Sequence, residues 1–338
     1  MKNNRIHYIG NKLSKHGSTK TVNETLGSLL TSQGYKVTYA SSKKNIVLRL
    51  LDMIFSAIYF SRSIDYVFID TYSTLNFWYV FFVSQICRIL KLKYIPILHG
   101  GNLPTRINKY PNCSNLIFNN AYRIIAPSGY LYDAFSKKYS KELVEISNVI
   151  EINNYPYIER KYAVPKLLWV RSFNPIYNPK MAIEVLFNLK NEFPNAELTM
   201  VGPDSNDYRK ECELLAAKLN LNVSFSGKLT QEEWISLSKT HNIFINTSNF
   251  DNMPVSVIEA MALGLPIIST NVGGIPYLLK DQEEAILVHA ADSEAMSQSV
   301  IKIFSNPEFR KLVIENARKK AENFDWEVEK HKWFEILK

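Results

Sequence analysis

Residues 246–274 constrain the fold more than any other part of the chain. An apolar run ends there in a small polar cluster, and Pro254 then stands where the first turn of a helix tolerates a missing amide donor. Gly264 would end that helix, and the apolar, β-branched run at 265–270 suits a strand covered on both faces. The stretch therefore predicts a strand, a polar loop, a short helix and a buried parallel strand.

Two carboxylates in this stretch, Asp251 and Glu259, are separated by seven residues. Eight residues of helix rise about 12 Å, whereas the two catalytic carboxylates of a glycoside hydrolase stand about 5 to 9.5 Å apart. The two acids are therefore expected to bind two ends of one polar ligand. The free backbone amides at the start of the helix favour binding of an anion. The plainer alternative is an ordinary strand–helix unit with two solvated acids.

These residues resemble the family-4 glycosyltransferases of the GT-B architecture, whose signature is two glutamates seven residues apart followed by a strand and Gly-Gly. Residues 259–266 read Glu-Ala-Met-Ala-Leu-Gly-Leu-Pro, and Gly-Gly follows at 273–274. Asp251 stands where the family has the first glutamate, and Asn252 stands where it has glycine. The resemblance implies that Glu259 binds the ribose hydroxyls of a nucleotide and that Asp251 approaches the donor sugar.

The expected fold class is α/β, with two Rossmann-like parallel-sheet domains facing across a cleft, and 338 residues suffice for two domains. The predicted boundaries are 1–155 for an acceptor-side domain, 160–322 for a nucleotide-sugar domain, and 323–338 for a helix that returns to the first domain. Strands are expected at 6–9, 35–39, 65–70, 94–98, 121–126, 167–170, 198–203, 223–229, 243–245 and 265–270, and helices at about 20–32, 45–60, 71–87, 292–304 and 307–323.

A second turn that resembles the family follows the predicted strand at 94–98. His99, Gly100 and Gly101 form a His-Gly-Gly turn, which in the family faces the donor sugar, and glycines let backbone close on a ligand. His99 is expected to stabilise developing charge or to hydrogen-bond a sugar hydroxyl; the alternative is a histidine that only completes a turn. Arg106 is the acceptor-side cation of this region, or else part of a solvated loop.

Arg171 and Lys180 stand where the family clamps the donor diphosphate, although the loop here is longer and lacks the usual glycines. A guanidinium and an ammonium can neutralise phosphate charge as the sugar–phosphate bond breaks. Two solvent-facing cations are the alternative. The other expected donor contacts are Gly17 in the first strand–helix turn, Gly202, then Gly227, Lys228 and Leu229 beside the base, and Asn252, Met253, Pro254 and Val255 at the start of the helix.

Family resemblance implies transfer of a sugar from a nucleotide diphosphate sugar, most readily a UDP or GDP sugar, to a hydroxyl of a glycan or lipid-linked glycan in cell-surface polysaccharide synthesis. It implies retention of configuration, no bound cofactor and no metal, and no Asp-x-Asp motif occurs in the chain. A sugar-nucleotide epimerase or phosphorylase on the same fold, and a non-catalytic sugar-nucleotide binding partner at the membrane, are the alternatives. The missing glycine fingerprint disfavours a dehydrogenase. The sugar, base, acceptor, linkage and oligomeric state are left open.

Charge is distributed unevenly along the chain, with a net charge of +12 over residues 1–150 and −4 over the rest. A basic first half suits an anionic membrane or a phosphorylated lipid acceptor, and no nucleic-acid-binding signature accompanies it. Residues 71–87 carry no charge and many aromatics, but also Ser, Thr, Asn and Gln, which favours a helix packed on a sheet over a membrane span.

The helices at 45–60 and 71–87, flanked by Lys and Arg, make contact with one face of a membrane a second interpretation. Three scattered cysteines and the lack of an apolar signal segment predict the cytoplasm, with peripheral attachment to the inner face of the membrane as an option.

Overall fold

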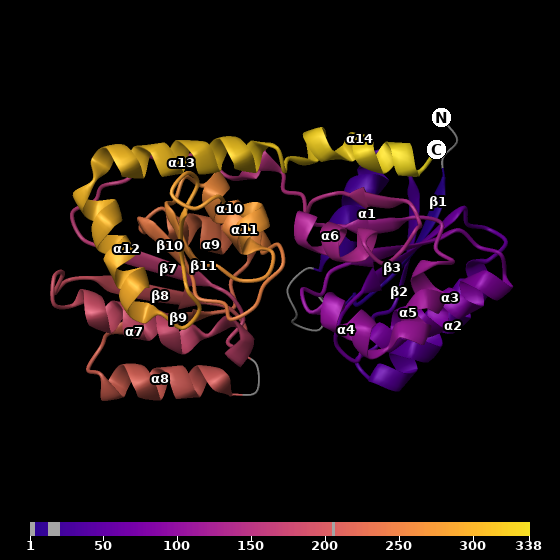
Figure 1. The fold of residues 1–338 in the computed structure, drawn as a ribbon, viewed down its shortest axis with the longest axis horizontal. Coiled ribbons are helices and arrows are strands. Elements are labelled where there is room, and N and C mark those ends of the chain that lie inside the picture. Colours follow the sequence, from indigo (N-terminus) through magenta and orange to yellow (C-terminus); the bar gives the residue numbers. More distant parts are fainter. Residues whose placement is uncertain (1–3, 13–20, 205–206) are drawn as a thin grey trace. The chain divides into compact units, whose positions relative to one another are not determined.

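The computed structural model describes residues 4–12, 21–204 and 207–338. The chain divides into two compact units: unit 1 is Met1–Val149 with Glu329–Lys338, and unit 2 is Ile150–Val328. Each unit contains a six-stranded sheet in which neighbouring strands are parallel (Figure 1). The predicted fold class, α/β with two Rossmann-like parallel-sheet domains, is confirmed.

The sheet of unit 1 has the strand order β2-β1-β3-β4-β5-β6. The chain order therefore reverses between the neighbouring strands β1 and β3, which is the position where open α/β sheets bind ligands. In order along the chain, the elements are β1 (Arg5–Ile9), α1 (Val22–Ser32), β2 (Lys36–Ala40), α2 (Ile46–Phe60), β3 (Tyr66–Thr71), α3 (Phe77–Ile89), β4 (Tyr94–Leu98), α4 (Leu103–Lys109), α5 (Pro111–Phe118), β5 (Ile124–Ala126), α6 (Gly129–Ser136) and β6 (Leu143–Glu145).

Strand β3 shows how unit 1 covers both faces of its sheet. All six residues of β3 are buried, and successive side chains of a strand point to opposite faces. Val67 and Ile69 join the apolar core that α2, α3, α5 and α6 complete. Phe68 points to the other face, where the ring of Trp333 lies 5.6 Å away. Trp333 belongs to α14 (Trp326–Ile336), so the end of the chain forms part of unit 1.

The sheet of unit 2 has the strand order β12-β11-β10-β7-β8-β9. Its chain order reverses between β7 and β10, which are hydrogen-bonded neighbours. The elements are η2 (Ile152–Asn154), β7 (Lys166–Val170), η3 (Pro175–Tyr177), α7 (Pro179–Leu189), β8 (Glu197–Val201), α8 (Tyr208–Lys218), β9 (Val223–Gly227), α9 (Gln231–Ser238), β10 (Ile243–Asn246), α10 (Val255–Ala262), β11 (Ile267–Thr270), α11 (Ile275–Leu278), β12 (Ile286–Val288), α12 (Ser293–Ser305) and α13 (Pro307–Glu322).

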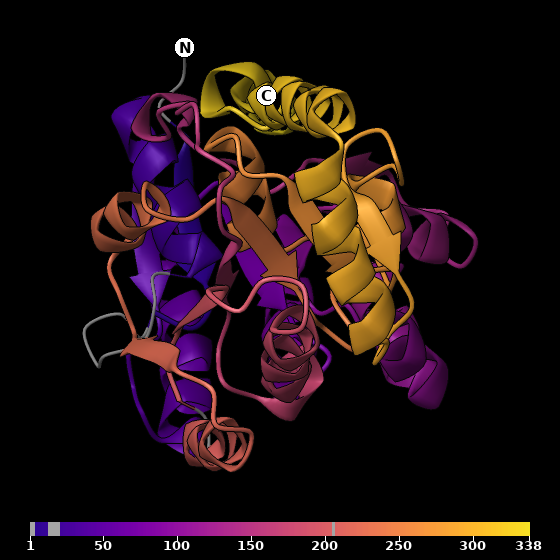
Figure 2. The same cartoon turned by 90° about the vertical axis from the view of Figure 1, so that its left-hand side faces the viewer.

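Alternation along β7 divides the core of unit 2 into two layers. Leu167 and Trp169 pack with α7 and α12, whereas Leu168 packs with α10 and α13 on the opposite face. In Figures 1 and 2, α7 and α8 accordingly lie below the strands of unit 2 and α13 lies above them. Helices on both faces explain why the central strands β7 and β10 are mostly apolar in the sequence.

Most predicted elements occur within a few residues of their expected limits, and the exceptions have local causes. The helix expected at 71–87 begins at Phe77, because the residues before it form a turn after β3. Pro254 has an extended backbone and occupies the cap position, so α10 begins at Val255. Among the described residues, no helix combines the length and apolarity needed to cross a bilayer.

Candidate functional site

The carboxyl ends of β7 and β10 bring two distant parts of the sequence together. Arg171 directly follows β7, and the loop that contains Asp251 follows β10. The chain leaves these two neighbouring strands toward opposite edges of the sheet, and open α/β sheets bind their ligands beyond strand ends of this kind. The structure thus places two predicted site residues at the switch point of unit 2.

Arg171 and Asp251 form a buried ion pair at this point. Nη2 of Arg171 donates to Oδ2 of Asp251, and the two side chains are only 18% and 10% exposed. Oδ2 also accepts from the hydroxyl of Ser248 at 3.1 Å, and Oδ1 accepts from the backbone amide of Asn252 at 3.0 Å. The guanidinium lies over the ring of Tyr177 at 4.6 Å. These contacts hold both charged groups in fixed positions.

The charge on Arg171 is secure despite its burial. Burial acts to lower the pKa of Arg171, but the neighbouring Asp251, followed by Tyr177 and Glu259, outweighs that effect and raises the pKa. Its Nε atom is buried and has no hydrogen-bond partner among the described residues. The guanidinium therefore remains a cation, and its Nε atom can donate a hydrogen bond in addition to the one that Nη2 donates to Asp251.

Glu259 lies in α10 and accepts two hydrogen bonds through Oε1. The hydroxyl of Tyr155 donates at 2.6 Å and Nε2 of Gln231 donates at 3.3 Å. Burial raises the pKa of Glu259 to about 7, although both hydrogen bonds and the charge of Arg171 favour the ionised form. Burial, followed by the charge of Glu259, also raises the pKa of Tyr155. Glu259 is thus a carboxyl group that titrates near neutrality.

The Gly-Gly pair after β11 lets the Asp251 loop pack tightly. A Cβ atom at Gly273, whose φ is +54°, would lie 2.1 Å from the carbonyl oxygen of Asp251. A Cβ atom at Gly274 would lie 2.1 Å from the carbonyl oxygen of Asn252, and the amide of Gly274 donates to the carbonyl of Asp251 at 3.0 Å. Side chains at these two positions would push the loop away from its site.

Gly202 makes the same kind of close approach on the other side of Arg171. Its φ is +153°, and a Cβ atom there would lie 1.7 Å from the carbonyl oxygen of Arg171. The amide of Gly202 donates at 2.8 Å to the carbonyl of Gly227, which also has a positive φ of +69°. The structure therefore gives Gly202 a packing role, and the donor contacts expected of Gly202 and Gly227 stay predictions.

The other residues predicted around the nucleotide lie at the edges of an apolar layer. Met253 and Val255 at the start of α10 pack with the core on that face of the sheet, as does Leu229 after β9. Asn252 is buried, and Lys228 is exposed. Their predicted contacts with a base or a phosphate remain predictions.

Lys180 has a different setting from Arg171. Its ammonium lies 2.7 Å from Oε2 of Glu211 and 5.0 Å from the ring centre of Tyr208, both of which belong to α8. The hydrogen bond that Lys180 donates to Glu211 is the main cause that raises the pKa of Lys180. The structure thus pairs Lys180 with α8 and not with Asp251, and its predicted role in the diphosphate clamp stays untested.

In unit 1, His99 pairs with an aspartate at the carboxyl ends of the neighbouring strands β3 and β4. Nε2 of His99, directly after β4, lies 2.7 Å from Oδ1 of Asp70 in β3, and the side chains are 7% and 0% exposed. The ring of Tyr72 lies 5.2 Å from the imidazole. Because Asp70 occupies one ring nitrogen, the orientation of His99 is fixed.

Further polar groups surround Asp70 in the interior. Its Oδ2 atom and Nδ2 of Asn23 are buried without a hydrogen bond of normal geometry to any described residue. A Cβ atom at Gly10 would lie 2.2 Å from Oδ2 of Asp70 and 2.5 Å from Nδ2 of Asn23. Burial, followed by the charge of Asp70, raises the pKa of Tyr8. Since buried polar groups are normally hydrogen-bonded, this cluster holds unused bonding capacity beside His99.

The glycines and the arginine that follow His99 are held by the turn after β3. A Cβ atom at Gly100 would lie 2.5 Å from the amide nitrogen of Ser73, and Gly101 belongs to the turn that leads into α4. Nε of Arg106 donates to the carbonyl of Ser73 at 2.6 Å. Arg106 is therefore anchored to this turn, and its acceptor contact stays a prediction. Gly17 lies outside the described residues.

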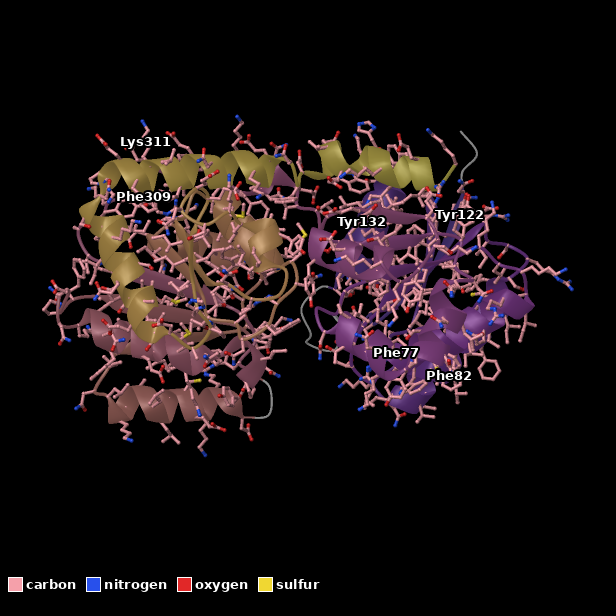
Figure 3. The ribbon with its side chains drawn as sticks, viewed as in Figure 1. Phe77, Phe82, Tyr122, Tyr132, Phe309 and Lys311 are labelled. Carbon is pink, nitrogen blue, oxygen red and sulfur yellow. The ribbon has the colours of Figure 1, made fainter. Side chains whose placement is uncertain are left out.

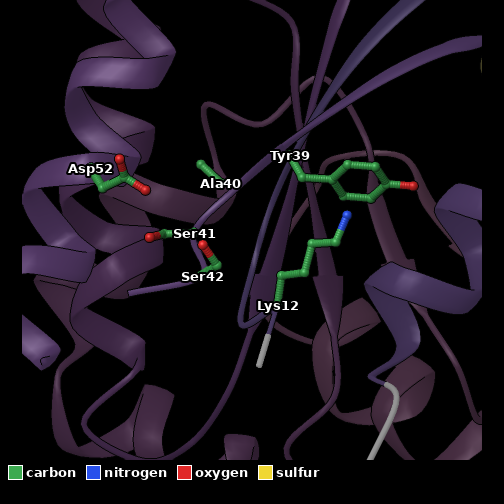
Figure 4. Close-up of a pocket in the computed structure, with 6 residues that line it drawn as sticks. All are labelled: Lys12, Tyr39, Ala40, Ser41, Ser42 and Asp52. Atoms are coloured by element: carbon green, nitrogen blue, oxygen red, sulfur yellow. The ribbon is translucent and has the colours of Figure 1, made fainter. Parts of the chain in front are cut away.

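A polar cavity lies beyond the carboxyl ends of β1 and β2 in unit 1 (Figure 4). Its volume is about 310 Å³, and the ammonium of Lys12 lies 3.6 Å from the centre of the Tyr39 ring. An ammonium, hydroxyls and an aromatic ring suit a small hydroxylated or anionic group. The lining residues, none of which the sequence singled out, are Lys12, Tyr39, Ala40, Ser41, Ser42 and Asp52.

The sequence did not single out Tyr155, Gln231 or Asp70. Tyr155 stands at the end of the first predicted domain, and Gln231 stands in the first turn of α9 between the capping residues Thr230 and Glu233, so neither carried a functional signal of its own. Asp70 had one usable signal, since it stands at the carboxyl end of a predicted parallel strand.

Comparison with known proteins identifies relatives over both units. The family model described as glycosyl transferases group 1 matches residues 158–320. The sulfoquinovosyl transferase of Arabidopsis thaliana is 24% identical over 148 residues, 43% of this chain and 28% of that protein. The N-acetyl-alpha-D-glucosaminyl L-malate synthase of Bacillus anthracis is 23% identical over 246 residues, 68% of this chain and 62% of that protein.

Solved structures share the fold over nearly the whole chain. Sucrose-phosphate synthase from Thermosynechococcus elongatus superposes with a TM-score of 0.81 at 16% identity, covering 99% of this chain and 98% of that one. HepE from Anabaena, solved in complex with UDP and glucose, superposes with a TM-score of 0.79 at 16% identity, covering 98% and 99%.

Proposed function

We propose that the protein is a glycosyltransferase of the group 1 family, whose model matches residues 158–320, and that it transfers a sugar from a nucleotide diphosphate sugar to a hydroxyl group of a glycan or lipid-linked glycan. The observation that carries the proposal is the buried pair of Arg171 and Asp251 at the switch point of unit 2, with Glu259 close enough to affect the pKa of Arg171. A permanent cation near two carboxyl groups suits a ligand with both phosphate and hydroxyl groups.

The donor is assigned to unit 2. Glu259 accepts hydrogen bonds from the ribose hydroxyls, Arg171 binds the diphosphate, and Asp251 approaches the sugar. The amides at the start of α10 add to the anion site, and Lys180 joins the clamp when it exchanges Glu211 for a phosphate. UDP is the favoured nucleotide over GDP, because the related fold of HepE was solved with UDP and glucose.

The reaction is proposed to retain the configuration of the sugar and to need no metal. Arg171 neutralises charge on the leaving diphosphate, which is the role that a metal plays elsewhere. Attack on the same face, assisted by the leaving phosphate, requires no enzymatic nucleophile. His99, oriented by Asp70, hydrogen-bonds a sugar hydroxyl or stabilises developing charge.

The acceptor is assigned to unit 1, whose basic sequence suits a phosphorylated lipid-linked glycan of cell-surface polysaccharide synthesis. The three cysteines are all free thiols, which supports a cytoplasmic location. The chain spans 28% and 62% of the length of the two relatives described above, so their substrates do not transfer to it directly.

Thermal-shift titrations with UDP, GDP, ADP and their sugars test the donor, and a radiolabelled donor with candidate glycan acceptors tests transfer. We expect stabilisation by a uridine or guanosine diphosphate, and its loss in the Glu259→Gln variant but not in a Glu192→Gln control at an exposed position. Conversion of the donor sugar without an acceptor would identify an epimerase instead. Binding without turnover under every acceptor would identify a non-catalytic binding protein.

A further inference from the structure

Helix α2 carries an unusual number of exposed apolar side chains. They are Ile46, Val47, Leu48, Leu51, Phe55, Ile58 and Tyr59, each between 43% and 82% exposed. Exposed apolar side chains that occur singly are normal, but a contiguous group of this size marks an interaction surface.

The buried face of α2 is the opposite one. Arg49, Met53 and Ala57, at a spacing of four residues, point into unit 1. A helix on the surface of a globular protein ordinarily carries polar residues on its outer stripe. On α2 that stripe includes Leu51 and Phe55. The apolar outer stripe therefore contributes nothing to the core of the unit.

Helix α3 extends the same surface. It packs beside α2, and the hydroxyl of Tyr79 in α3 donates to the carbonyl of Ile46 at 3.2 Å. Leu75, Phe82 and Ile89, spaced seven residues apart along and just before α3, are 66%, 43% and 75% exposed. Figure 3 shows Phe82 at the outer edge of unit 1. We call these three residues and the seven on α2 the apolar patch.

Cations flank the two helices that carry the apolar patch. Exposed Lys and Arg residues stand before α2, after it and around the end of α3, whereas Asp52 is the one acid within the two helices. An apolar centre with a cationic rim complements an anionic lipid surface, which offers both hydrocarbon and negative charge. A second copy of the same surface would instead oppose cations to cations. The rim consists of Lys43, Lys44, Arg62, Arg88 and Lys91.

We propose that the apolar patch docks the protein on the surface of an anionic lipid bilayer. With 15 residues, α2 is too short to cross a bilayer, so it would lie in the plane of the interface. Phe55 and Leu51 insert among the acyl chains while the rim binds the headgroups. Docking on a bilayer would bring the protein to the lipid-linked acceptor of the proposed function. The residues of the apolar patch are different from those of the donor site.

Sedimentation with vesicles tests this proposal in the full chain. The probes are vesicles of phosphatidylcholine alone and of equimolar phosphatidylcholine and phosphatidylglycerol. We expect binding to the anionic vesicles only, and a decrease of about tenfold or more when Leu51→Ser and Phe55→Ser are combined. The matched control combines Phe187→Ser and Leu214→Ser, which replace side chains that are 48% and 63% exposed on helices of unit 2.

The rim has its own test. Lys43→Gln combined with Lys44→Gln should weaken binding to the anionic vesicles by about tenfold and reduce its sensitivity to salt. Equal binding to both vesicle types, equal loss in the control variant, or no vesicle binding at all would overturn the proposal. Self-association that only the Leu51 and Phe55 changes abolish would overturn it in favour of a dimer interface.

Nucleotide binding separates this proposal from the proposed function. Every variant of the patch should keep the UDP-induced thermal shift of the unchanged protein. A protein that binds vesicles but no nucleotide would refute the glycosyltransferase proposal alone, whereas one that binds UDP but no vesicle would refute the docking surface alone.

Discussion

Replacing Glu259 by glutamine should stabilise the protein increasingly as the pH rises from 4 to 8. The pKa of Glu259 is raised from 4.5 to about 7, chiefly by burial. Between these values the folded protein binds a proton that the unfolded chain has released, so stability falls as the pH rises. At 1.36 kcal/mol per pKa unit, the full cost above pH 7 is about 3 kcal/mol. Glutamine has the same shape and never ionises.

Urea unfolding of both proteins across this pH range measures the effect. We define the difference as the free energy of unfolding of the Glu259→Gln variant minus that of the unchanged protein. This difference should be smallest near pH 4 and should be about 3 kcal/mol larger at pH 8. His7, whose pKa burial lowers to about 4, acts in the opposite direction, because its folded form stays neutral where the unfolded form is protonated. That contribution is common to both proteins and cancels in the difference.

A pH-independent difference would refute the reasoning, since it would mean that Glu259 ionises as readily in the folded protein as in the unfolded chain. The Glu192→Gln variant, which makes the same change at an exposed position, supplies the control. The same variants, assayed for UDP binding, separate the stability effect from the proposed contact with ribose.

Three further experiments test the geometry around Arg171, Gly273 and Asp70. Arg171→Ala should lower the free energy of unfolding by about 3 kcal/mol, because it leaves a buried carboxylate unpaired, and a second change, Asp251→Asn, should restore part of that loss in urea unfolding. Gly273→Ala should destabilise by about 2 kcal/mol or more through an unfavourable positive φ and a clash with backbone, whereas Gly227→Ala, which has a positive φ but no such clash, should cost about 1 kcal/mol. Asp70→Asn should reduce the rate of sugar transfer by as much as about 100-fold with unchanged UDP affinity, because it loosens the histidine after β4; an equal loss of UDP affinity would contradict a positioning role.

The strand–loop–helix unit at 246–274 could be predicted because its signals are local. Gly264 has a φ of +70° at the end of α10, and the buried run after it forms β11. The helix expected from about residue 292 also begins at a local signal, since the carboxylate of Asp292 accepts from the amide of Ala295 at the start of α12. Each of these features depends on residues within a few positions of one another, and so the sequence pattern determines it.

The ion pair between Arg171 and Asp251 could not be predicted in this way. Both residues were expected in the site, but with separate roles, because nothing local links residues 80 positions apart. Their contact follows from the strand order, which places β7 beside β10. The contacts of Tyr155 and Gln231 with Glu259 depend in the same way on three segments that only the fold brings together.

Two predicted site cations or histidines, Arg171 and His99, pair with an acid at the end of a neighbouring strand, whereas Lys180 does not. The difference lies in how far each residue stands from the end of its own strand. Arg171 and His99 each stand immediately after a strand, and each pairs with an acid at or beyond the end of a neighbouring strand. Lys180 stands further along, in the first turn of α7, and its ammonium reaches α8. Because the carboxyl ends of parallel strands converge while the helices diverge around the sheet, a motif residue displaced into the helix by a longer loop loses its partners. The longer loop between Arg171 and Lys180 therefore places Lys180 beside Glu211. A variant with a shorter loop should bring the ammonium of Lys180 closer to Arg171.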